Sequence, residues 1–356
     1  MIAKSPENVI VFVEVKARRN DVFGSGGAAV TPAKQRKIIR TAKQYIFDHR
    51  LSWEGDFRFD VILFEKDRME HMVHFFNKEK RMILENKSEY VDWNAKVPVI
   101  RYASLDETGC VEHGFSTRLG GVSKGIYRSM NLSYTRGDDK NHVDENFRRF
   151  CSAVHMDWKR VVGTDQTHTS NVRVVAEKDA GHGIIRSKTY HDVDGQITNV
   201  PGLPLITYHA DCVPLFFVDP VKKALGLTHS GWRGTVGRIG RNTVEAMGKN
   251  YGSRPEDIIG VIGPSICQSC YEVSQDVAEK FEKDFHVTDA LVYAKENGKY
   301  QLNLWEANRQ IMLDAGMLPE HITVTGWCTG CHPDLLWSHR KTGNNRGSLA
   351  AFLCLK

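Results

Sequence analysis

Long apolar runs are absent from this chain of 356 residues. No stretch approaches the ~20 consecutive apolar residues that a membrane-spanning helix needs. The N-terminus also lacks the pattern of a signal peptide, because Lys4 and Glu7 precede its only apolar run and Glu14 and Lys16 close it. Internal repeats and low-complexity tracts are absent as well. We therefore expect a globular protein of the cytoplasm that has no membrane partner.

The sequence also lacks the features of a protein that is stabilised by disulfide bonds. The chain has eight cysteines, and in a cytoplasmic protein these are free thiols or ligands more often than a disulfide framework. Two CxxC pairs occur, Cys267/Cys270 and Cys328/Cys331, and paired CxxC motifs suggest a structural zinc. Their separation of 58 residues (328 minus 270) is far wider than a compact zinc ribbon uses. Buried or incidental thiols are thus the favoured interpretation, with structural zinc as the alternative.

A strong net charge is missing too. Of the formal charge of +5, residues 1–78 carry +4, from 14 Lys and Arg against 10 Asp and Glu. Any affinity for nucleic acid would therefore lie in that segment. A helix is expected to begin at Thr31 and Pro32, and Lys34, Lys37, Arg40 and Lys43 place positive charge on one of its faces. A solvated helix surface is the favoured interpretation of this face, over a binding surface. We do not expect nucleic acid as a partner.

Residues 205–234 combine strand-like runs with reactive side chains at their ends. The runs 205–208, 213–218 and 224–228 have the length and composition of strands, and a helical pattern follows over 235–249. Cys212 falls at the junction of the first two runs, and His229 falls where the third gives way to a glycine-bracketed turn. His168 likewise lies between two extended pieces, 161–164 and 171–176. Further helices are predicted over 143–154 and 304–315.

Two imidazoles and one thiolate suit a borderline-soft divalent cation, and three protein ligands leave a fourth position open for water or substrate. His168, Cys212 and His229 form such a set, although their spacings of 44 and 17 residues match no local zinc-finger pattern. In the alternative interpretation, the histidines are satisfied polar residues at strand ends and Cys212 is a small core residue. Asp211 is an orienting residue, an acid/base or an Asx-turn residue.

The opening of the chain resembles the YraN-type family, whose fold is nuclease-like. VFVEVKAR, FGSGGAAVTPAKQRKIIRTA, RFDVILFE and MEHMVHFF follow one another over residues 9–76 as in that family. Related nucleases of the PD-(D/E)xK type use a pair such as Glu14 and Lys16 together with an upstream acidic residue to hold a divalent cation. That upstream residue is missing, so the resemblance implies a truncated, inactive α/β fragment at 1–78. The charged residues 79–97 are expected to be a connector.

The remainder, residues 98–356, resembles the YfiH/YlmD-type family, formerly labelled multicopper polyphenol oxidases (laccases). The motifs occur in the family's order: HGFSTRLGGVS, NLSYTRGDD, DQTH, ADCVPLFFVD, HSGWRG, IGPSICQSCYEV, LNLWEANRQIMLDAG and SHRKTGNNRG. The resemblance implies an α+β fold with layered mixed sheets, sometimes grouped with cysteine-hydrolase-like proteins. It also implies a zinc-dependent purine nucleoside phosphorylase, acting on adenosine, inosine and methylthioadenosine with phosphate, that has adenosine deaminase activity.

The same resemblance implies the site residues. His168, Cys212 and His229 would be the metal ligands, Arg118 would be catalytic or substrate-binding, and Cys212 and Asp211 would take part in catalysis. In the closing motif, Ser338, His339 and Arg346 align as substrate-binding positions, whereas Lys341 and two inserted asparagines depart from the family pattern. His209 precedes Asp211 by two positions, where it is a surface histidine or, less favoured, a spare ligand.

Three chemistries remain open. A set of two histidines and one cysteine also describes a blue-copper centre, so copper is possible. However, no two of the 15 histidines stand two positions apart, and the trinuclear cluster of known laccases is built from His-x-His pairs. Oxidase activity therefore ranks below phosphorolysis and deamination, for which Arg118 and Arg346 are candidate phosphate ligands. A peptidoglycan-editing amidase that uses Cys212 as nucleophile is the other alternative.

Overall fold

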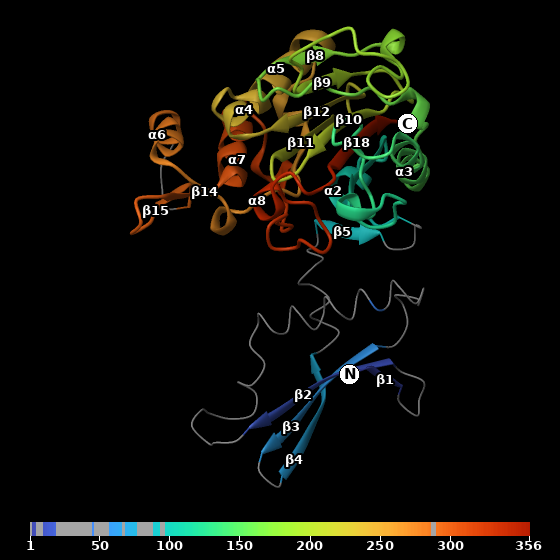
Figure 1. The fold of residues 1–356 in the computed structure, drawn as a ribbon. Coiled ribbons are helices and arrows are strands. Elements are labelled where there is room, and N and C mark those ends of the chain that lie inside the picture. The colour runs from blue at the N-terminus through green and yellow to red at the C-terminus, as the bar shows by residue number, and fades with distance from the viewer. Residues whose placement is uncertain are drawn as a thin grey trace. The chain divides into compact units, whose positions relative to one another are not determined.

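The computed structural model describes residues 2–4, 10–18, 45, 57–65, 68–76, 88–92, 97–285 and 290–356. The chain divides into two compact units, 1–83 and 84–356, and Figure 1 draws both. Each is described by itself. The helix expected from Thr31 lies outside the described residues. Within the described part, no helix has the length and apolarity that crossing a membrane requires.

The first unit contains a four-stranded sheet in the order β1-β2-β3-β4. Its strands are β1 (Ile2–Lys4), β2 (Ile10–Arg18), β3 (Phe57–Glu65) and β4 (Arg68–Phe76). The pair β2 and β3 is parallel and the other two pairs are antiparallel. Glu14 of the nuclease-like motif lies on β2, directly opposite Val61.

The second unit is built on two large sheets. The five-stranded sheet has the order β10-β18-β7-β6-β5 and the six-stranded sheet has the order β17-β13-β11-β12-β9-β8. The first comprises β5 (Glu89–Asp92), β6 (Val99–Tyr102), β7 (Val111–Ser116), β10 (Leu205–His209) and β18 (Leu349–Leu355). The second comprises β8 (Val172–Val174), β9 (Gly195–Thr198), β11 (Val213–Asp219), β12 (Ala224–Ser230), β13 (Ile259–Ile262) and β17 (Ile322–Val324). A small third sheet has the order β14 (Glu272–Val273), β16 (Tyr300–Leu302), β15 (Val292–Ala294).

Helices occupy the connections between these strands. The α-helices are α2 (Ala103–Asp106), α3 (Lys140–Ala153), α4 (Trp232–Val236), α5 (Ile239–Tyr251), α6 (Gln275–Asp284), α7 (Leu304–Asp314) and α8 (His339–Thr342). Short 3-10 turns are η3 (Gly125–Tyr127), η4 (Trp158–Arg160), η5 (Glu177–Asp179), η6 (Pro255–Asp257), η7 (Gln268–Cys270) and η8 (Pro319–His321). The mixed-sheet α+β architecture agrees with the expected fold.

The two large sheets pack face to face, with helices on both outer faces. Alternate residues of β11 show this, because Phe216 joins the core between the sheets whereas Leu215 and Phe217 join the core beneath α5 and α7. On β18, Phe352 similarly points toward α3. Burial on both faces explains why these strands read as continuous apolar runs rather than alternating ones.

Several predicted elements are confirmed with small shifts in their bounds. The three central strands become β10, β11 and β12, and the helices predicted over 143–154 and 304–315 become α3 and α7. The helix predicted over 235–249 is broken in two, because Arg238 takes a left-handed backbone with φ of 58° between α4 and α5. The expected connector 79–97 contains β5, which pairs with β6.

Candidate metal centre and its surroundings

Two neighbouring strands bring Cys212 and His229 together. In the antiparallel pair β11 and β12, Pro214 lies opposite His229 and Val213 opposite Ser230. Cys212 immediately precedes β11, so it stands beside the end of β12. His168 comes from a loop in which Asp165 bridges to Val193. The residue itself has a left-handed backbone with φ of 66°. The sequence-distant trio therefore meets at one end of the six-stranded sheet.

The ligand atoms of these three residues, which we call the histidine–cysteine centre, lie within 4.8 Å of one another. The Cys212 sulfur is 3.9 Å from His168 Nε2, and the two imidazole rings meet edge to face with centroids 5.0 Å apart. Ligand bonds of ~2.0–2.3 Å would place such donors about 3.5 Å apart, so the set fits one small cation after a slight contraction. His229 is buried while His168 is exposed to solvent, so the centre is open on the His168 side.

A buried carboxylate supports both histidines. Asp194 is fully buried, and its Oδ1 lies 2.8 Å from His229 Nδ1. The same carboxylate accepts the backbone N–H groups of Thr167, His168 and Thr169. Holding Nδ1 in this way orients the ring so that Nε2 of His229 is available as a ligand. Sequence reasoning missed Asp194, because nothing in the DVDG segment distinguishes it from the neighbouring acids.

Room for the centre depends on Gly231. A Cβ at this position would lie 2.9 Å from His168 Cδ2 and 3.2 Å from the Cys212 sulfur. The first of these separations is shorter than side chains tolerate, so glycine is the residue that allows the close approach. This gives a physical reason for the glycine in the HSGWRG motif.

The charges at the centre favour a thiolate. Burial raises the pKa of the Cys212 thiol, but the positive charge of His229 and a hydrogen bond with His168 outweigh it and lower the pKa to about 6. Burial in turn lowers the pKa of His229, whereas the Cys212 thiolate and Asp194 raise it, to about 9. Metals and nucleophilic chemistry both require the thiolate form.

The sequence suggested that His209 is a surface residue or a spare ligand, and the structure shows that it is neither. Its side chain is 2% exposed. Nε2 lies 2.8 Å from the Thr207 hydroxyl and Nδ1 lies 3.0 Å from the Cys212 carbonyl. Both ring nitrogens are therefore occupied, and burial, followed by the charge of His229, holds the pKa of His209 well below its usual value. The residue shapes the turn that carries Cys212.

Asp211 holds several loops in place. Its backbone is left-handed, with φ of 92°, a strained conformation for a residue other than glycine. One carboxylate oxygen accepts the Thr329 hydroxyl at 2.6 Å and the other accepts the Arg340 backbone N–H at 2.6 Å. Its carbonyl accepts the N–H of Ile266. With both oxygens engaged, the carboxylate is arranged to position the turn rather than to exchange protons.

Arg118 packs against an aromatic ring. Its guanidinium carbon lies 3.6 Å from the centroid of Trp337, and its terminal nitrogens donate to the carbonyls of Pro333 at 2.6 Å and Arg128 at 3.3 Å. Burial lowers its pKa, while Asp334 raises it. The structure thus gives Arg118 a set of partners within the fold.

Arg346 donates from one terminal nitrogen to the Gly347 carbonyl at 2.8 Å, and Arg136 donates to the Asn344 carbonyl at 3.1 Å. The buried Nε of each arginine, in contrast, has no hydrogen-bond partner. Burial, reinforced by the charge of Arg136, lowers the pKa of Arg346 to about 10, while Asp211 and Cys212 raise it. The two guanidinium groups repel each other, and their unpartnered Nε–H donors would be satisfied by a bound anion. Arg136 lies in the NLSYTRGDD motif, but its role depends on tertiary proximity that the sequence does not show.

The other two positions of the closing motif have structural partners. Ser338 is 2% exposed and caps α8, accepting the backbone N–H of Lys341. His339 is exposed, and its Nδ1 lies 3.1 Å from the Gly343 carbonyl. Both contacts lie within the segment that forms α8 and its cap.

The four cysteines of the CxxC pairs also converge. Their sulfurs lie within 4.8 Å of one another, although the sequence favoured incidental thiols. Among the residues that the structure describes, this group and the histidine–cysteine centre are the two places where three or more such side chains could hold a metal.

Comparison with known proteins places these features in context. Residues 112–356 match the family model described as multi-copper polyphenol oxidoreductase laccase. Residues 1–64 match the uncharacterised protein family UPF0102, in line with the YraN-type resemblance of the opening segment.

Named relatives and a solved structure agree with that match. Purine nucleoside phosphorylase YlmD of Bacillus subtilis is 38% identical over 247 residues, covering 68% of this chain and 88% of that protein. Adenosine deaminase RL5, from an unknown prokaryotic organism, is 33% identical and covers 70% of this chain and 97% of that protein. The crystal structure of YlmD from Geobacillus stearothermophilus superimposes with a TM-score of 0.70 at 32% identity, covering 75% of this chain and 99% of that one.

Proposed function

The chain belongs to the multi-copper polyphenol oxidoreductase laccase family, and from that membership we propose a zinc-dependent purine nucleoside phosphorylase that also deaminates adenosine. Adenosine, inosine and methylthioadenosine are the proposed nucleosides, with inorganic phosphate as second substrate. The names of similar proteins, purine nucleoside phosphorylase and adenosine deaminase, support this class of activity. We also propose that the enzyme acts in the cytoplasm.

The observation that carries the proposal is the convergence of His168, Cys212 and His229 with one side exposed. Three ligands and an open position are the arrangement of catalytic rather than structural zinc. When bound, zinc supplies a Lewis acid that polarises water or a substrate oxygen. Asp194 keeps His229 in the orientation that this requires.

Phosphate binding rests on Arg346 and Arg136. In phosphorolysis a phosphate oxygen forms a bond to the anomeric carbon of ribose while the bond to the purine nitrogen breaks. The products are ribose 1-phosphate and the purine base, which takes up a proton. The unpartnered Nε atoms of the two arginines offer fixed positive charge to a bound oxyanion. Arg118, held by carbonyls and Trp337, is proposed to shape the substrate pocket. Ser338 and His339 are proposed to line it.

Copper oxidase chemistry is less well supported despite the family's description. Known laccases need a trinuclear copper cluster, and in the described part of the chain the two converging ligand groups are the histidine–cysteine centre and the four cysteines. Neither provides the several histidines of such a cluster. We therefore propose zinc, not copper, at the histidine–cysteine centre.

An amidase is the second candidate, and one observation favours it. The Cys212 sulfur lies 3.9 Å from His168 Nε2, and the pKa of this thiol is about 6. A thiolate beside an imidazole is the arrangement of a cysteine nucleophile with its base. Such an enzyme would act on a serine-bearing cell-wall precursor.

Product analysis tests the proposal. The purified full chain is incubated with adenosine, with and without phosphate, and separately with the serine-bearing precursor. We expect adenine and ribose 1-phosphate only when phosphate is present. Inosine should form in both cases, and with phosphate it should be converted further to hypoxanthine and ribose 1-phosphate. In Cys212→Ala the rates of both reactions should fall by more than ~100-fold, because losses of up to that size are typical when only a residue that supports a metal ligand is changed. Release of serine without any nucleoside product would instead identify the amidase.

A further inference from the structure

Two cysteine pairs that are far apart in sequence meet because of strand pairing. β13 and β17 are parallel neighbours, with Ile262 opposite Val324, so the loops that follow them leave the same edge of the sheet. The pairing continues into these loops, where Ser265 bridges to Cys328. Each CxxC turn therefore begins a few residues beyond one of two adjacent strands. The separation of 58 residues (328 minus 270) in the sequence has no bearing on their distance in space.

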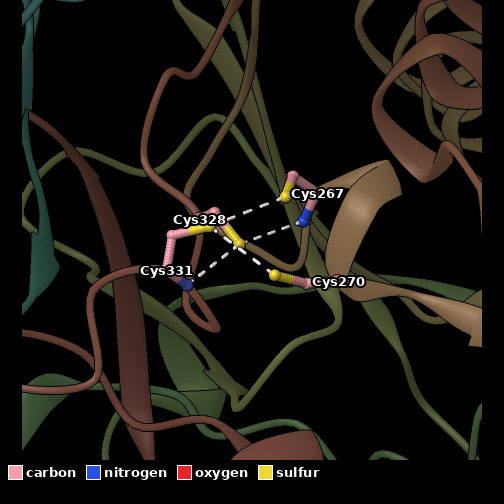
Figure 2. A group of neighbouring side chains, drawn as sticks. All are labelled: Cys267, Cys270, Cys328 and Cys331. Atoms are coloured by element: carbon pink, nitrogen blue, oxygen red, sulfur yellow. Dashed lines mark hydrogen bonds between the residues drawn. The ribbon is translucent and has the colours of Figure 1, made fainter. Parts of the chain in front are cut away.

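Figure 2 shows the sulfurs of Cys267, Cys270, Cys328 and Cys331, which we call the four-cysteine cluster, directed toward one another from the two loops. The Cys331 sulfur lies 3.9 Å from that of Cys267 and 3.5 Å from that of Cys270. These separations exclude the ~2.05 Å of a disulfide, and all four thiols are free. They match the sulfur separations of about 3.8 Å that follow from four bonds of ~2.3 Å to one tetrahedral ion.

The backbone around the cluster is arranged to receive thiolates. The N–H groups of Cys267 and Cys331 both donate to the Cys328 sulfur, at 3.2 and 3.4 Å. Donors of this kind stabilise the charged form of a thiol. Gly330 closes the turn around the sulfurs, because a Cβ there would lie 3.2 Å from the Cys270 sulfur and 3.7 Å from the Cys328 sulfur. The small residue thus lets the two turns approach one another.

We propose that the four-cysteine cluster binds one zinc ion with four thiolate ligands, as a structural centre separate from the histidine–cysteine centre. Each cysteine gives up its proton on binding, so the metal replaces protons that would otherwise keep the crowded sulfurs neutral. Four sulfur ligands in a tetrahedron select zinc or iron. An iron–sulfur cluster distributes its cysteines over two or more irons, which is inconsistent with four sulfurs within 4.8 Å of one another.

The ion would hold the two loops that support the turn before Cys212. Ile266, beside the first CxxC turn, donates its N–H to the Asp211 carbonyl at 3.0 Å. Thr329, inside the second turn, donates its hydroxyl to the Asp211 carboxylate at 2.6 Å. A fixed four-cysteine cluster would therefore fix Asp211 from two sides and, through it, the position of the adjacent Cys212.

Metal counting on the full-length protein tests the proposal. Zinc per chain is measured by elemental analysis after dialysis for wild type, Cys331→Ala, Cys212→Ala and the double variant. Cys331→Ala should hold one equivalent less than wild type. Cys212→Ala should still hold one equivalent, and the double variant none. Cys110→Ala, which removes a cysteine outside both groups, should leave the count unchanged. Substitution with cobalt should give strong thiolate-to-cobalt absorption. Cys331→Ala should reduce it to the weaker band of the single Cys212 thiolate, whereas Cys212→Ala should keep the strong band of the four-cysteine cluster.

The Cys212→Ala variant decides the question even if Cys331→Ala fails to fold. A Cys212→Ala protein without metal would overturn the proposal, as would disulfides in the four-cysteine cluster detected by mass spectrometry. Iron in place of zinc would also overturn it. These results do not depend on catalysis. Absence of phosphorolysis would refute the proposed function and leave the metal count of the four-cysteine cluster unaffected.

Discussion

The histidine–cysteine centre and the four-cysteine cluster both lie at the ends of strands of the same six-stranded sheet, yet their surroundings differ. At the histidine–cysteine centre three ligands converge and His168 faces solvent. A buried carboxylate lies behind them, and Arg346, whose Nε has no partner, carries its positive charge close enough to interact with Cys212. At the four-cysteine cluster four sulfurs close around one point, and two backbone N–H groups donate to one of them.

The comparison shows that the number of protein ligands decides whether a metal centre can react with a substrate or can only stabilise the fold. An open position gives substrate access to the cation, and side chains that tune charge accumulate around it. A closed set leaves no position for substrate, so its contribution is limited to holding loops together. Because the two groups have Asp211 as a common neighbour, the same fold offers a test of both roles in one molecule.

The largest effect in this comparison should come from the positive charge of Arg346 near the histidine–cysteine centre. Replacing Arg346 by Ala removes a half-buried guanidinium whose buried Nε has no partner, and we expect kcat/KM for phosphorolysis to fall by ~10²–10³. The KM for phosphate should rise, while deamination, which uses no phosphate, should change far less. Steady-state kinetics of the two reactions on one preparation measure the difference.

Arg346→Lys is the matched control. It keeps a positive charge but loses the planar fork that holds an oxyanion with two hydrogen bonds, so its activity should lie between wild type and Arg346→Ala. An equal loss in phosphorolysis and deamination would contradict the assignment. It would show that Arg346 supports the nucleoside pocket and not the phosphate.

A smaller effect, on zinc affinity, is expected from changing Asp194, the carboxylate that supports the ligand His229. Asp194→Asn keeps the shape of the side chain but removes the charge that faces His229 Nδ1 at 2.8 Å. We expect zinc affinity at the histidine–cysteine centre to fall by ~10–100-fold, with no change at the four-cysteine cluster. Competition with a chelator of known affinity, followed by a metal count, measures both.

Asp179→Asn controls for the loss of a buried carboxylate elsewhere. Asp179 is 2% exposed and pairs with Arg173 at 2.9 Å, outside either ligand group. This variant should lose stability and retain the zinc affinity of wild type. Equal chelator sensitivity of Asp194→Asn and wild type would show that the carboxylate positions the loop alone.

The contrast between the two groups also separates what sequence reasoning reached from what it missed. The central strands were predicted because burial on both faces leaves a continuous apolar run. The resemblance supplied His168, Cys212 and His229, which the structure brings together. Gly231 could have been recognised from the motif, but the two atoms that its Cβ would meet are known only from the fold.

The missed features all depend on which strands are neighbours. The four-cysteine cluster was discounted for its spacing, yet the parallel pairing of β13 with β17 removes that objection. Asp194 acts across the Asp165–Val193 bridge, and Arg136 acts through its nearness to Arg346. His209 was expected at the surface, but β10 lies at the edge of the sandwich core and buries it. Local patterns contain no information on such proximity.

The smallest effect should come from the link between the two groups. Thr329 is fully buried between Cys328 and Gly330, and its hydroxyl donates to Asp211. Thr329→Val keeps the shape and leaves a buried carboxylate oxygen without its donor, which should lower the free energy of unfolding by ~1–3 kcal/mol. Both metal equivalents should remain, and catalysis should fall less than in Asp194→Asn. Urea unfolding, metal counting and kinetics measure the three quantities.

Thr329→Ser, which retains the hydroxyl, is the control and should behave like wild type. The pair of variants decides whether the four-cysteine cluster communicates with the histidine–cysteine centre through this hydrogen bond. If Thr329→Val lowers stability but leaves kcat and KM unchanged, the two groups share a scaffold without being coupled in catalysis. If it lowers kcat while both metals stay bound, the position of Cys212 depends on Asp211, and Asp211 depends on the loop that the four sulfurs hold.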